Sequence, residues 1–106
     1  MDFPTEVADL TATELLAAFR AGELSPVEAA EASLDRIRAF NPTVNAYCLV
    51  DEERTLRAAR AAERRYREGN ANGLLDGVPV AIKDVFMTRG WPTLKGSKAI
   101  DPGQSW

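Results

Sequence analysis

The amino-acid sequence predicts an α/β fold, in which N-terminal helices lead into the first strands of a β-sheet. Two capping boxes of the Thr/Ser-x-x-Glu type, each followed by apolar residues at helical spacing, predict the helices. An uninterrupted apolar run over residues 78–82, ending in Lys83, predicts a strand. A strand without polar alternation is typical of a sheet that helices cover on both faces.

The first two helices are expected as a hairpin over about residues 11–41. Capping boxes at residues 11–14 and 25–28 mark the two starts. Pro26 occupies the first helical position of the second helix, where its missing N–H costs nothing. Asn41-Pro42 is expected to close that helix.

A short strand is expected next, over about residues 46–50, because β-branched and aromatic residues are concentrated there between Asn45 and Asp51. A third helix is expected over about residues 51–68. Acidic residues in its first turn and arginines in its last turn complement the helix dipole. Gly69 should end this helix.

The lysine-bearing strand is expected over about residues 78–83. Pro79 cannot donate to a sheet ladder, so it places the start of the strand at an edge or bulge. Lys83 stands at the carboxyl end, where ligand sites of α/β folds gather. Free lysine titrates near pH ~10.4, and burial in an apolar strand is one way to provide a neutral lysine base. Without further context, a lysine at a strand end is usually a solvated surface group.

Composition excludes several classes of function. The 106 residues carry 13 basic and 16 acidic side chains, a net charge of −3, so a nucleic-acid partner is not expected. With no histidine and a single cysteine, Cys48, the sequence has no internal disulfide, no Cys–His pair and no metal-ligand spacing. No cofactor or metal is expected. The N-terminus lacks the pattern of a signal peptide or membrane span, and a cytoplasmic location is the default expectation.

The residues around the lysine form a specific pattern. Residues 77–84 (Gly-Val-Pro-Val-Ala-Ile-Lys-Asp) are followed by Gly-Trp-Pro-Thr at 90–93 and Gly-Ser at 96–97. Together these segments resemble the amidase signature family, residue for residue between 73 and 97. The resemblance implies a mixed β-sheet flanked by helices. It also implies a Ser-Ser-Lys triad that hydrolyses carboxamides, and it assigns the lysine of that triad to Lys83.

The resemblance further implies that much of the enzyme lies outside this sequence. The family's nucleophilic and bridging serines belong to a Gly/Ser-rich segment well downstream of the lysine, and no such segment precedes Trp106. Ser97 lacks that context and is expected to cap a helix or turn. Residues 1–106 are therefore expected to form the N-terminal part of a single amidase domain, with an incomplete fold and no activity alone.

The implied mechanism is general-base catalysis. Neutral Lys83 would activate the downstream serine through the second serine, and an acyl-enzyme would then be hydrolysed, with the amide nitrogen leaving as ammonia or an amine. Asp84 could orient the lysine. However, successive strand residues face opposite sides, so we favour a structural role in capping the following turn.

The sequence constrains the identity of the substrate less than it constrains the type of reaction. Trp91 replaces a smaller aliphatic residue, Leu94-Lys95 replaces a threonine-rich stretch, and Val85 replaces an asparagine that is frequent in the corresponding component of tRNA-dependent amidotransferases. These departures favour an amidase for small aryl or aliphatic amides. The alternative is a glutamyl-tRNA amidotransferase A-type subunit.

A non-catalytic binding or assembly module remains a further alternative if the natural chain is this short. The expected partner is a small-molecule amide, with no membrane. Association of two copies through exposed apolar faces is left open, and the side chains that would form such faces are Leu16, Phe19, Leu34 and Ile37.

Overall fold

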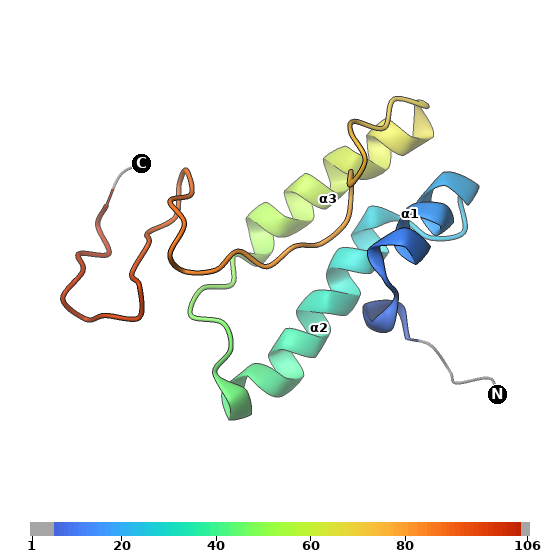
Figure 1. Cartoon of the computed structure of the whole chain (residues 1–106). Coiled ribbons are helices and arrows are strands. Elements are labelled where there is room, and N and C mark those ends of the chain that lie inside the picture. Colours follow the sequence, from blue (N-terminus) through green and yellow to red (C-terminus); the bar gives the residue numbers. More distant parts are fainter. Residues whose placement is uncertain (1–5, 105–106) are drawn as a thin grey trace.

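The computed structural model describes residues 6–104 (Figure 1). A 3-10 helix, η1 (Val7–Asp9), precedes three α-helices, which are α1 (Ala12–Ala21), α2 (Pro26–Val44) and α3 (Glu52–Arg67). An irregular segment of turns follows α3 and continues to residue 104. None of these helices combines the length and the apolar character needed to cross a membrane.

The α/β fold class expected from the sequence is wrong, because residues 6–104 contain helices and no strand. Both expected strands, at 46–50 and 78–83, are irregular. The nearest approach to a sheet in the described part is an isolated antiparallel bridge between Thr88 and Trp91. Strands are stable only when neighbouring strands pair with their backbone groups, and no ladder forms along 78–83. Val80, expected in a buried strand, is 81% exposed.

Helices α1 and α2 begin at complete capping boxes. The Thr11 N–H donates to Glu14 Oε1 at 2.8 Å, and the Glu14 N–H donates to Thr11 Oγ1 at 3.1 Å. Ser25 and Glu28 repeat the arrangement at 3.3 and 3.1 Å. Each box provides partners for backbone donors that the helix itself leaves unsatisfied.

Helix α2 continues past Asn41-Pro42, the expected stop, and ends at Val44 with Pro42 inside its last turn. Proline at this position removes a single backbone hydrogen bond near the helix end. Asn45 then closes the helix in the left-handed conformation, with φ of 51°, and its N–H donates to the Asn41 carbonyl at 2.7 Å. The Asn41 side chain holds the following loop through two hydrogen bonds with the Tyr47 backbone, at 2.8 and 3.1 Å.

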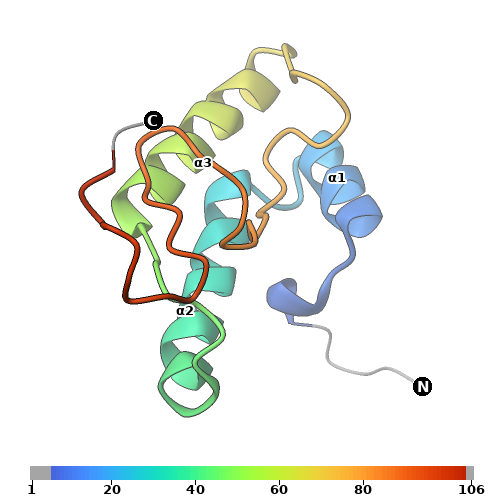
Figure 2. The same cartoon turned by 60° about the vertical axis from the view of Figure 1, so that its left-hand side comes forward.

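The core forms where the three helices meet. Helix α2 lies alongside α3 in both views (Figures 1 and 2). Leu15 and Phe19 of α1 pack with Ala29 of α2, and Phe19 is only 4% exposed. The Phe19 ring also contacts the Tyr66 ring of α3, with centroids 5.5 Å apart and planes tilted by 56°. Phe19 therefore joins all three helices.

Gly77 brings the irregular segment back onto this core. Its φ of +86° lies in the left-handed region, and a Cβ added there would lie 2.8 Å from Pro26 Cγ and 3.3 Å from Phe19 Cε2. Val78, the next residue, packs against the core. Glycine is required at this position both by the backbone conformation and by the space available.

We predict that Gly77→Ala lowers the free energy of unfolding by about 2–4 kcal/mol, because left-handed strain and overpacking add. Gly73→Ala is the matched control. Gly73 also has a positive φ, of +80°, but nothing lies within 4 Å of its added Cβ. It should therefore cost only about 1–2 kcal/mol. Urea denaturation measures both, and equal losses would show that the contact with Pro26 is unimportant.

Candidate functional site

Lys83 lies exposed on the irregular segment, at the start of a tight turn. Its carbonyl accepts the N–H of Val85 at 2.8 Å and the N–H of Phe86 at 3.2 Å. The apolar residues before it do not bury the lysine, because they are themselves on the surface; Ile82 is 51% exposed. The side chain is therefore accessible, and its catalytic role stays a prediction.

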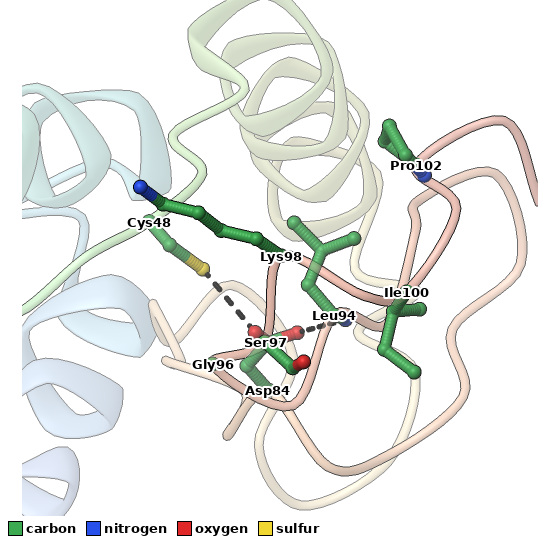
Figure 3. Close-up of a pocket in the computed structure, with 8 residues that line it drawn as sticks. All are labelled: Cys48, Asp84, Leu94, Gly96, Ser97, Lys98, Ile100 and Pro102. Atoms are coloured by element: carbon green, nitrogen blue, oxygen red, sulfur yellow. Dashed lines mark hydrogen bonds between the residues drawn. The ribbon is translucent and has the colours of Figure 1, made fainter.

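Asp84 is the best-connected residue beside the lysine (Figure 3). Its Oδ1 accepts the Leu94 N–H at 2.9 Å, and its Oδ2 lies 3.6 Å from the Cys48 Sγ, which donates to it. The Asp84 backbone carbonyl accepts the Lys95 N–H at 3.1 Å. The carboxylate thus ties the turn after Lys83 to residues 94–96 and to the loop between α2 and α3. These contacts are structural, but the carboxylate bonds Leu94 and Cys48 and caps none of the N–H groups of the turn that directly follows Lys83.

These contacts also stabilise the charged form of Asp84. The hydrogen bond from the Leu94 N–H lowers the pKa of the carboxyl group most. The Gly96 N–H, the Cys48 thiol and the charge of Lys83 act in the same direction, against the opposing effect of burial. Asp84 is therefore an anion at neutral pH.

An open depression of about 360 Å³ lies beside Asp84 (Figure 3). It combines a carboxylate, a hydroxyl, an ammonium and a thiol with apolar side chains. The lining residues are Cys48, Asp84, Leu94, Gly96, Ser97, Lys98, Ile100 and Pro102. Within residues 6–104, no group of three or more His, Cys, Asp or Glu side chains could hold a metal ion.

The turn at residues 88–91 is attached to the start of α3. The Trp91 Nε1–H donates to Asp51 Oδ2 at 2.9 Å, while Asp51 Oδ1 accepts the Arg54 N–H at 3.0 Å and caps the helix. The Arg54 guanidinium lies over the Trp91 ring, 4.5 Å from its centroid. Trp91, a departure from the family pattern, therefore has a structural role here.

Thr93 links two parts of the irregular segment and is only 4% exposed. Its hydroxyl donates to the Phe86 carbonyl at 2.9 Å. Its backbone N–H and carbonyl pair with the Gln104 side chain, each at 3.0 Å. Residues 84–104 are thus held together by side-chain hydrogen bonds in place of a sheet.

Asp76 attaches the beginning of the segment to α3. Its carboxylate accepts Arg65 Nε–H at 2.7 Å and an Arg65 guanidinium NH₂ group at 2.6 Å, together with the Asn72 N–H at 2.8 Å. The Tyr66 hydroxyl donates to the Asp76 carbonyl at 2.7 Å. A bidentate arginine–carboxylate pair of this kind is strong and directional. Asp76 therefore determines where the chain leaves α3 toward Gly77.

Sequence reasoning missed both the Arg65–Asp76 pair and the Asp51–Trp91 hydrogen bond. In the sequence, Arg65 stands out only as part of the basic last turn of α3. No spacing rule connects residues 11 or 40 positions apart across an irregular segment. The single available signal is the acidic residue directly before Gly77, in a turn that precedes an apolar run.

Comparison with protein families decides the classification. The model of the family described as Amidase matches residues 28–103, most of the chain. The protein belongs to the amidase family. The resemblance inferred from residues 77–97 is confirmed.

Curated relatives cover nearly all of this chain. The A subunit of glutamyl-tRNA(Gln) amidotransferase from Chloroflexus aurantiacus is 46% identical over 91% of the chain, and that from Myxococcus xanthus is 45% identical over 91%. The protein of the same name from Acidothermus cellulolyticus is 50% identical over 86%. The matched regions make up 20%, 20% and 18% of these relatives, so the chain spans about a fifth of their length. No solved structure matches.

We predict that Asp76→Asn lowers the free energy of unfolding by about 1–3 kcal/mol at pH 7, because the Arg65 charge loses its ionic partner. Arg65 holds the pKa of the Asp76 carboxyl below its ordinary value of 3.8 in the folded state. The stabilisation is therefore fully present above the unfolded-state pKa, and it is lost as the pH falls through the lower folded-state pKa. The difference in free energy of unfolding between wild type and Asp76→Asn should therefore disappear below about pH 3.8.

Urea denaturation at a series of pH values measures this gap. Glu53→Gln is the control, because Glu53 pairs with Arg57 at 2.6 Å on the exposed face of α3. Its cost should stay within about 0.5 kcal/mol at every pH. A gap for Asp76→Asn that is independent of pH would show that the charge of Asp76 does not stabilise the fold.

Proposed function

We propose that this chain is part of a glutamyl-tRNA amidotransferase A-type subunit, in which an amidase site releases the amide nitrogen that is transferred. The observation that carries the proposal is identity of 45–46% to proteins of that name over 91% of the chain. Such identity extends far beyond the lysine motif into the helical part of the chain. Membership of the amidase family supports the first step, cleavage of a carboxamide C–N bond.

This proposal replaces the preference for a stand-alone amidase acting on small amides. That preference rests on Val85, Trp91 and the Leu94-Lys95 pair. Trp91 here bonds Asp51 and stacks with Arg54, so the packing of α3 accounts for it. Departures confined to one segment weigh less than agreement at nearly half of the matched positions.

Lys83 is the residue of this chain that we assign to the reaction. Its amine would take a proton, through a bridging serine, from the serine that attacks the carboxamide carbon. The C–N bond then breaks, ammonia leaves with the returned proton, and water hydrolyses the acyl-enzyme to the carboxylic acid. Both serines would be supplied by residues outside this sequence. The exposure of Lys83 supports the assignment, because a partner segment can reach it.

The test of the substrate class uses the full-length protein purified with its co-expressed partner subunits. Ammonia release from glutamine, from asparagine and from a simple aryl amide would be compared, with and without glutamyl-tRNA. We expect an amino-acid carboxamide to be preferred and its nitrogen to appear in glutaminyl-tRNA. Efficient hydrolysis of the aryl amide with no transfer to tRNA would contradict the proposal.

We predict that Lys83→Ala in the same complex lowers kcat for amide hydrolysis by at least about 10²–10⁴-fold, because the general base is removed. The melting temperature should be unchanged, since the Lys83 side chain is exposed. Lys95→Asn is the matched control, an exposed lysine in the same segment whose positive φ of 53° asparagine tolerates. Activity of Lys83→Ala within tenfold of wild type would refute the assignment.

A further inference from the structure

We propose that Asp84 is the positioning residue for Lys83, and that it sets the direction from which the lysine amine meets its proton donor. The inference rests on the proposed function, in which Lys83 is the base. It adds a role for the neighbouring carboxylate, which acts through the backbone and does not touch the substrate.

The lysine side chain has no support of its own. Among the described residues, none forms a hydrogen bond or an ion pair with the Lys83 ammonium, and its charge acts on the Asp84 carboxylate only from beyond ion-pair distance. The side chain is exposed. A free lysine side chain samples many rotamers, and ordering it costs up to about 2 kcal/mol. The backbone from which it projects must therefore supply whatever orientation the folded chain imposes on it.

On its C-terminal side, the Lys83 carbonyl accepts the N–H groups of Val85 and Phe86 and so closes a tight turn. The residue of this turn that bonds both other loops is Asp84. Three groups converge on this residue: the N–H of Leu94, the Sγ of Cys48 and the N–H of Lys95, which reaches the backbone carbonyl. They come from two different loops, as Figure 3 shows for Cys48 and Leu94. On the N-terminal side, the nearest comparable anchor is Asp76, well before the lysine in the chain.

Between Val78, which packs against the core, and Asp84, the chain has little packing to hold it. Val80 is 81% exposed and Ile82 is 51% exposed. A displacement at Asp84 would therefore pass directly to Lys83, one peptide away, without being resisted by the preceding residues. A shift of about 1 Å in a catalytic group can cost on the order of a hundredfold in rate.

The same contacts argue against Asp84 as an acid or base in its own right. Both carboxylate oxygens already accept hydrogen bonds, from Leu94 and from Cys48. The neighbouring donors keep the pKa of this carboxyl below its ordinary range, so it holds no proton to give at neutral pH. Asp84 therefore contributes by fixing the position of the backbone that carries Lys83.

The experiment compares Asp84→Ala, Asp84→Asn and Asp84→Glu with wild type in the full-length protein, with glutamine as the probe substrate. We expect Asp84→Ala to lower kcat by about 10–100-fold while KM changes less than about threefold. Asp84→Asn keeps an oxygen for the Leu94 N–H and should recover most of the loss. Asp84→Glu should not, since its longer side chain displaces the turn.

Asp101→Asn is the matched control. The Asp101 carboxylate also accepts a backbone N–H, that of Gly103 at 2.8 Å, in the same irregular segment, and it takes no part in the hydrogen bonds that hold Asp84. It should retain kcat within about twofold. Circular dichroism gives the folded fraction of each variant, and thermal melting reports its stability. These two readouts separate a misplaced lysine from a smaller folded fraction.

The proposal is overturned if Asp84→Ala keeps kcat within about threefold, or if its loss vanishes once kcat is divided by the folded fraction. Failure of the proposed function gives a different result, because Lys83→Ala then remains active whatever the Asp84 variants do. An inactive Lys83→Ala together with a fully active Asp84→Ala would refute the positioning role alone.

Discussion

The bidentate pair between Arg65 and Asp76 is the contact on which the arrangement of the C-terminal half depends. Asp76 has a side chain only 5% exposed, and without the arginine it would be a buried charge with a high desolvation cost. The pair fixes the chain at the end of α3, so that the next residue, Gly77, can lie against Pro26 and Phe19. The position of the irregular segment from Val78 onward therefore depends on this ion pair.

A second carboxylate, Asp84, organises the region that carries the candidate catalytic lysine. No sheet is present in the described part of the chain. Individual hydrogen bonds hold residues 84–104: Asp84 accepts the Leu94 N–H, Thr93 donates to Phe86, and Trp91 donates to Asp51 at the start of α3. Such connections are local and few, and they leave apolar side chains such as Phe86 and Met87 on the surface, at 63% and 70% exposure. The accessibility of Lys83 follows from the same arrangement.

Membership of the amidase family gives these features a chemical context. The relatives are about five times longer than the matched region, so the serines of the proposed mechanism have ample chain in which to occur. The segment described here would then contribute the base and its support, while the nucleophile and the oxyanion donors would come from elsewhere in the polypeptide. In a site whose base and nucleophile come from different segments, each segment must be oriented so that the reacting groups meet.

The sequence by itself determined the helices, their starts and the family. Thr11 with Glu14 and Ser25 with Glu28 are three residues apart, so their bonds depend only on local geometry and could be predicted. The segments at 77–84, 90–93 and 96–97 indicated the family for the same reason, because each of them is contiguous. Only the tertiary structure decided that residues 46–50 and 78–83 form no strands, that α2 passes through Pro42, and that Asp76 and Trp91 are anchored to α3. Strand formation and long-range ion pairs depend on partners distant in sequence, and an apolar run alone does not specify them.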